Sequence, residues 1–319
     1  MLLTPEVLTI TILNAVILIF AIIAFYFSVK ILLKYNPVLT TPKQYQMQMQ
    51  SYLVATIIKF ILYVKIPLFV FFIFTLDKIA TILPGAMCGA GVVNATEYGT
   101  RLLMLKIVNL YLFSFWIVLH HEDMKSEEQK YLKTKFFIFT IAFVLLLTEI
   151  FLQNLMFYSI DVNSVVDCCG AIFSTTDGSY LSKLLNIKPV FLLSIFYGIY
   201  LLMMAMYFLK NKYLFALFNL FFIISALVTL IAFFGTYIYE LPTHHCPFCF
   251  LQKEYHYIGY ILYLTLFIGT FEGLIVGFID FSEKDLNEKY KLSLVFNFIY
   301  LLLVSYYPLR YYYENGVFL

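Results

Sequence analysis

The chain has 319 residues, of which 62% are hydrophobic and only 13% are charged, and its mean hydropathy is +0.88. Soluble domains contain roughly 45–50% apolar and about 25% charged residues, so this composition excludes a water-soluble protein and indicates an integral membrane protein surrounded by lipid. The net charge of +2 is uninformative, and no basic patch suggests nucleic-acid binding. Lysine outnumbers arginine 19 to 2, a bias typical of AT-rich prokaryotic genomes, so we expect a bacterial inner membrane protein.

Eight apolar runs along the chain are long enough to cross a membrane, since a spanning helix needs about 20 residues. They lie at 8–29, 52–75, 102–119, 136–157, 189–209, 214–237, 257–279 and 292–307. The first run follows no basic segment and is too long for a signal peptide, so we expect it to remain as a helix. The sequence therefore predicts an all-α bundle of about eight transmembrane helices.

The connections between these helices differ in charge. Those after the first, third, fifth and seventh runs hold 12 lysines, whereas the other connections and the C-terminus hold six lysines and arginines. The positive-inside rule then places both termini outside. All five cysteines fall in the outer loops, namely Cys88 in 76–101, Cys168 and Cys169 in 158–188, and Cys246 and Cys249 in 238–256.

The most informative stretch is T-H-H-C-P-F-C-F-L-Q-K-E-Y-H-Y, at 243–257. If Pro247 is an early residue of the seventh helix, one helical stripe about 80° wide carries a set of reactive and polar side chains. The set is Cys246, Cys249, Lys253, His256 and Tyr260. A helix N-terminus stabilises a thiolate, so the stripe predicts an activated dithiol above a basic residue.

C-P-F-C-F-L-Q-K resembles the C-x-x-C-x-x-Q-R pattern of DsbB-type membrane disulfide oxidoreductases. The order of segments is also similar to the vitamin K epoxide reductase family, in which loop cysteines follow the first helix of a four-helix core and C-x-x-C opens the fourth. The resemblance implies that Cys246 and Cys249 pass electrons to a quinone near Lys253. It implies three segments of the chain: an N-terminal three-helix segment at 1–135, a core at 136–280 and a last helix within 281–319. Cys168 and Cys169 take the place of the loop cysteines, although they are adjacent here and separated in that family.

Two chemical interpretations follow from the cysteines. In the first, an extracytoplasmic thiol protein passes electrons through Cys168, Cys169 or Cys88 to the Cys246–Cys249 pair and then to quinone. In the alternative, Cys246, Cys249, His244 and His245 bind a soft metal such as copper. The first requires a quinone-sized cavity lined by Lys253, whereas the second requires three or four ligand atoms that converge on one point. Purely structural disulfides are a third possibility.

Lys59, Lys65, Glu149 and Glu272 lie within the apolar runs, where charges are costly and need partners. Their depths predict two contacts between helices, Lys65 with Glu149 and Lys59 with Glu272. Such pairs hold helices together, or they form a proton path toward the cysteines.

The two halves of the chain share one pattern. Helices one to four and five to eight have the same orientation, and a cysteine segment precedes the third helix of each half. This pattern indicates a parallel repeat.

Overall fold

The computed structural model describes residues 4–36, 41–125, 129–166 and 187–319, so the predicted sites Cys168 and Cys169 lie outside the described residues. Within these ranges the regular structure is helical, without a strand. Eight of the described helices are long and apolar enough to cross a membrane, which confirms the predicted all-α, multi-span fold.

Several of the helices extend beyond their apolar runs because polar residues continue them. The first four long helices are α1 (Pro5–Lys34), α2 (Pro42–Ala80), α4 (Glu97–Lys125) and α5 (Leu132–Ser159), with the short α3 (Gly89–Asn94) before α4. The next are α8 (Pro189–Phe208), α9 (Lys212–Thr229) with its continuations η1 (Leu230–Phe234) and α10 (Gly235–Tyr239), α11 (Ile258–Ile275) and α12 (Glu283–Asn315). Pro5, Pro42 and Pro189 each lie in a first turn, where a missing N–H breaks no helical hydrogen bond.

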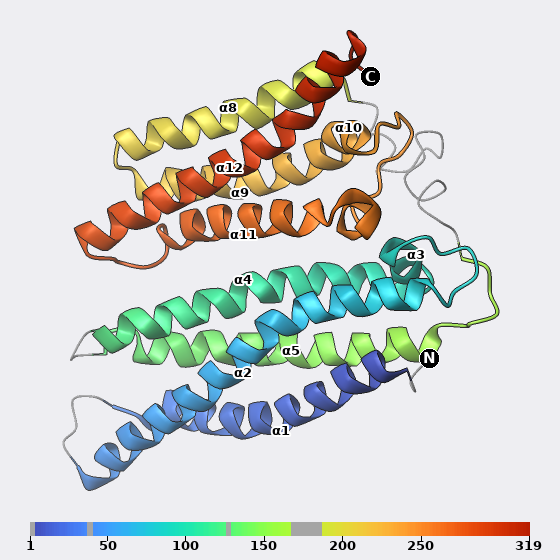
Figure 1. Cartoon of the computed structure of the whole chain (residues 1–319). Helices are drawn as coiled ribbons and strands as arrows, with labels where there is room; N and C mark the ends of the chain where they lie inside the picture. The colour runs from blue at the N-terminus through green and yellow to red at the C-terminus, as the bar shows by residue number, and fades with distance from the viewer. Residues whose placement is uncertain (1–3, 37–40, 126–128, 167–186) are drawn as a thin grey trace. The chain divides into compact units, whose positions relative to one another are not determined.

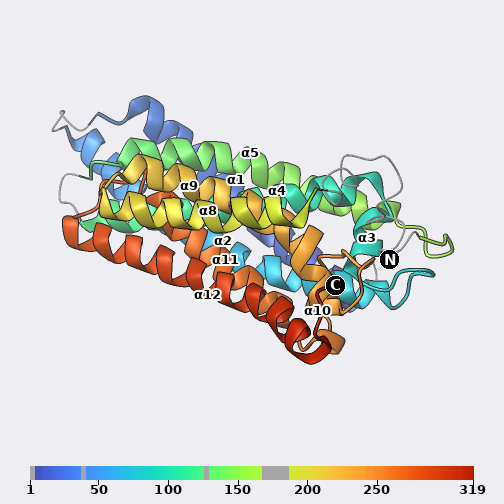
Figure 2. The same ribbon diagram turned by 90° about the horizontal axis from the view of Figure 1, so that it is seen from above.

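The chain divides into two compact units. The first comprises Met1–Pro84 and Val92–Val166, and the second comprises Gly85–Gly91 and Asp167–Leu319. Within each unit every long helix packs against its neighbours in the chain, and the first packs against the fourth. Figure 1 and Figure 2 show the helices of each unit running lengthwise beside one another. Each unit is therefore a four-helix bundle of the same order, as the predicted repeat requires.

The first unit contains a buried cluster of charged and amide side chains. The predicted Lys65–Glu149 contact is confirmed, with Nζ 2.9 Å from Oε1. The sequence reasoning missed Lys106, whose Nζ lies 2.7 Å from the same oxygen, and Asn109, whose Nδ2 donates to Oε2 at 2.6 Å. These contacts join α5 to α2 and α4.

The second unit has an aromatic core with a polar centre. Phe196, Phe222, Phe234 and Tyr300 are buried within it. The carboxylate of Glu272 lies 2.8 Å from the ammonium of Lys289 on α12, a partner within the unit that the sequence reasoning missed. Lys59 belongs to the first unit, so the predicted Lys59–Glu272 pairing stays a prediction. Lys59 is exposed on α2, with its Nζ 5.8 Å from the Tyr63 ring centre. Equal depth in a membrane fixes the level of a side chain but not the direction in which it points.

Candidate functional site

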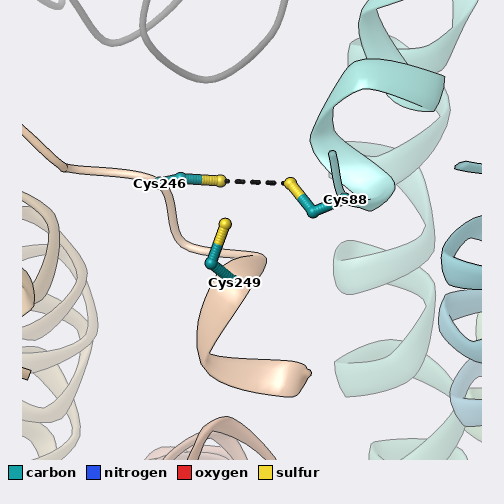
Figure 3. Close-up of side chains that lie close together, drawn as sticks. All are labelled: Cys88, Cys246 and Cys249. Carbon is teal, nitrogen blue, oxygen red and sulfur yellow. Dashed lines mark hydrogen bonds between the residues drawn. The ribbon is translucent and has the colours of Figure 1, made fainter. Parts of the chain in front are cut away.

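Three cysteines of the second unit form one buried cluster. The sulfur atoms of Cys88, Cys246 and Cys249 all lie within 4.8 Å of one another (Figure 3). Cys88 and Cys246 are 0% exposed and Cys249 is 5% exposed. The Sγ atoms of Cys88 and Cys246 are 3.5 Å apart, a thiol contact rather than a disulfide bond of about 2.05 Å. The structure thus brings Cys88 to the C-P-F-C pair. The predicted membrane topology, which puts both loops on the same side, is consistent with this contact.

The segment Gly85–Gly91 places Cys88 in the cluster. Gly85 adopts a left-handed conformation with φ 85°, which permits the turn that follows Pro84. The amide Nε2 of Gln252 donates to the carbonyl of Met87 at 2.9 Å, which attaches this segment to the loop that carries the other two cysteines. Met87 itself points outward, with 76% of its surface exposed beside a fully buried Cys88.

The C-P-F-C segment is not the start of a membrane helix, which corrects the sequence prediction. Short 3₁₀ turns occupy η2 (Cys249–Leu251) and η3 (Lys253–Tyr255), and α11 begins only at Ile258. His256 and Tyr257 have left-handed φ values of 54° and 57°, which cannot continue a right-handed helix. The loop folds back onto the start of α11, where a Cβ on Gly259 would lie 2.9 Å from the Phe250 side chain.

The predicted stripe of side chains therefore does not form. Cys246 and Cys249 lie outside any α-helix N-terminus, so the macrodipole does not activate them. Lys253 and His256 are exposed, and only Tyr260 belongs to the first turn of α11. The quinone interpretation needs a basic residue beneath the dithiol, and the exposed Lys253 does not provide it.

Two tyrosines from neighbouring helices hold the loop in place. The hydroxyl of Tyr239, at the end of α10, donates to the carbonyl of Cys246. The hydroxyl of Tyr263, in α11, donates to the carbonyl of Pro247 at 2.7 Å. The Tyr239 ring also stacks on Phe250 with centroids 4.8 Å apart. The sequence reasoning missed both tyrosines, since no local spacing links them to the cysteines.

The two histidines before Cys246 do not join the three sulfur atoms. The His245 ring is buried, and its Nδ1 lies 2.9 Å from the carbonyl oxygen of Ile231, to which it donates. His244 meets the edge of the Tyr239 ring at 4.3 Å. Burial lowers the pKa of His244, and the nearby Cys88 opposes that shift. Among the described residues the clustered ligand atoms are thus the three sulfurs, and the predicted set of His244 and His245 with the cysteine pair stays a prediction.

The cluster has the spacing that a metal–thiolate centre requires. Sulfur atoms bound at about 2.3 Å around one ion stand about 3.8–4.0 Å apart in tetrahedral or trigonal geometry, and the three sulfurs already lie within 4.8 Å of one another. Burial raises the pKa of Tyr255 beside the cluster, and Cys249 adds to that rise. A neutral phenol there leaves the sulfurs as the strongest donors.

Comparison with protein-family models, with curated proteins and with solved structures finds no match for this chain.

Proposed function

We propose that the second unit binds a soft, thiophilic metal ion, represented by Cu(I), through the thiolates of Cys88, Cys246 and Cys249. The convergence of three buried sulfur atoms within 4.8 Å carries this proposal. Of the two interpretations that the sequence left open, the metal interpretation required converging ligands, which are present. The quinone interpretation required a cavity lined by Lys253, and that side chain is exposed.

The type of ligand favours a soft ion. Thiolates select Cu(I) and Zn(II) over hard cations, and Zn(II) prefers four ligands in a structural site. Three sulfurs suit the lower coordination of Cu(I). Met87, an exposed thioether next to Cys88, provides a soft first contact for an ion that enters from the outer face. The distribution of lysines among the connections supports a site at the outer face, and we infer that the membrane is a bacterial inner membrane.

The test is anaerobic titration of the purified, reduced protein with Cu(I) in competition with a coloured Cu(I) chelator. We expect one tightly held ion per chain and a fall in affinity of at least about tenfold for Cys88→Ser, Cys246→Ser or Cys249→Ser, because metal affinity follows ligand identity and count. Lys253→Gln is the matched control and should bind as the wild type does. A wild-type protein that takes no Cu(I) from the chelator would overturn the proposal.

Thiol–disulfide exchange is a second candidate, because the 3.5 Å contact brings two sulfurs within reach of a third. In this chemistry the Cys249 thiolate attacks the Cys246 sulfur of an oxidised Cys88–Cys246 disulfide. A Cys246–Cys249 disulfide forms and Cys88 leaves as a thiolate, so electrons are conserved within the chain. A thiol protein would supply two electrons and two protons to such a disulfide, and a membrane quinone would accept them.

Disulfide mapping of the metal-free protein separates the two candidates. A reducible bond among these cysteines that reforms when quinone is added would favour exchange. In that case Cys246→Ser should abolish quinone reduction, whereas a metal site leaves quinone reduction undetectable in both the variant and the wild type.

A further inference from the structure

The buried cluster in the first unit has more positive than negative charge. Lys65 on α2, Lys106 on α4 and Glu149 on α5 are each at most 5% exposed. Both ammonium groups contact the same carboxylate oxygen, at 2.9 and 2.7 Å. Two cations therefore share one anion inside a membrane bundle. An uncompensated buried charge costs several kcal/mol, so this cluster requires a further negative charge.

The hydrogen bonds of the cluster show the same imbalance. Lys65 uses two of its three N–H groups, on Glu149 Oε1 and on Asn14 Oδ1 at 3.1 Å. Lys106 uses one, and its Nζ otherwise faces the Phe72 ring at 4.4 Å. Among the described residues, Asn14 Nδ2 is a buried donor without a partner and Asn109 Oδ1 is a buried acceptor without a partner. Donors therefore exceed acceptors, because the two lysines and Asn14 have N–H groups left.

A small cavity adjoins these groups. Its polar lining is Lys65, Lys106, Asn109 and Glu149, and apolar side chains from α2 and α4 form the rest. Its volume of about 10 Å³ holds one water-sized ligand. A cavity of this volume fits a small ligand.

We propose that this cavity binds a small monovalent anion of halide size, held by the ammonium groups of Lys65 and Lys106. An anion supplies both the missing charge and the missing acceptor, whereas a water molecule supplies only the acceptor. The Oδ1 atom of Asn14 accepts a hydrogen bond from Lys65, and the Nδ2 group of Asn14 provides a further donor near the site. The site belongs to the first unit and is independent of the cysteine cluster.

The test compares the thermal unfolding midpoint of the full chain in chloride and in gluconate at equal ionic strength. We expect the midpoint to rise with chloride concentration, because a ligand that binds only the folded state stabilises it. Lys106→Met should remove the chloride dependence, since it leaves the neutral Lys65–Glu149 pair. Lys59→Gln, which removes an exposed lysine of α2, is the control and should keep the dependence.

Direct binding of radioactive chloride to the wild-type protein provides a second measurement if Lys106→Met fails to fold. One bound chloride per chain, displaced by bromide but not by sulfate, supports the proposal. A midpoint that is insensitive to halides, with no chloride bound, overturns it and means that a lysine loses its proton instead. Equal chloride dependence in Lys106→Met would also overturn it.

Discussion

The carbonyl groups of Cys246 and Pro247 each accept a hydrogen bond from a tyrosine, and these two bonds position the cysteine loop. We expect Tyr263→Phe to lower the free energy of unfolding by about 0.5–1.5 kcal/mol, the net contribution of one such bond. Urea or thermal unfolding in detergent measures the change. Tyr313→Phe is the control, since Tyr313 is 91% exposed. An equal loss in both variants would show that the Tyr263 bond has no special role.

At the residue scale, the sequence predicted which cysteines share one side of the membrane, but it did not predict which side chains contact one another. Cys88 and the C-P-F-C pair were assigned to one outer face, and they do meet. The histidines were assigned to the site by proximity in sequence, but His245 turns to the Ile231 carbonyl. The sequence reasoning overlooked Lys106 within a predicted span. Lys106 lies three residues before Asn109, so both side chains lie on one face of α4 and both contact Glu149. Packing between helices, which no local pattern encodes, decides such contacts.

Helix packing in the second unit depends on glycines that face buried amides. A Cβ on Gly273 of α11 would collide with the Asn219 side chain. That amide accepts a hydrogen bond from Ser293 at 3.1 Å and another from Asn297 at 3.2 Å. The absence of a side chain at Gly273 therefore lets α9, α11 and α12 share one polar centre.

We expect Gly273→Ala to destabilise the protein by about 1–3 kcal/mol, the usual cost of overpacking. Gly198→Ala is a matched control on α8, where nothing lies within 4 Å of the added methyl group. It should be neutral or raise stability by up to about 1 kcal/mol, because alanine is the better helix former. Thermal unfolding of both variants gives the comparison. A stable Gly273→Ala protein would mean that the α9–α11 packing relaxes freely.

The ion cluster makes a similar prediction for the first unit. Glu149→Gln leaves Lys65 and Lys106 without their shared carboxylate, and breaking a buried pair in this way costs about 3–5 kcal/mol. Adding Lys106→Met to Glu149→Gln removes one of the stranded charges and should recover some of the loss, because contacting residues couple. Unfolding midpoints of the single and double variants measure the recovery. Additive losses would show that the two side chains do not interact.

At the scale of elements, the sequence predicted all eight long helices because each carries its own apolar run. It failed at the start of α11. Pro247 and the following apolar residues are compatible with a helix, but the left-handed residues His256 and Tyr257 end that possibility. Phe250 also packs closely on Gly259, a contact made only in the folded loop.

For the whole molecule, the two bundles have the same helix order and differ in their polar centres. The first unit uses charges on its second, third and fourth helices, at Lys65, Lys106 and Glu149. The second uses amides on its second and fourth helices, at Asn219 and Asn297. In each half of the chain a cysteine segment precedes the third helix. These parallels support a duplicated ancestor whose halves diverged in their polar centres.

The membrane orientation decides which compartment supplies the metal ion to the cysteine cluster. The exposed Lys253 precedes α11 and the exposed Lys284 follows it, so a spanning α11 separates them. We expect Lys253→Cys to react with a membrane-impermeant maleimide in intact cells. Lys284→Cys should react only after the cells are permeabilised, since the positive-inside rule predicts that the lysine-rich connections face the cytoplasm. The wild-type chain controls for labelling of the native cysteines. The opposite pattern would place the cysteine cluster at the cytoplasmic face, and the metal would then come from cytoplasmic thiol carriers rather than from outside.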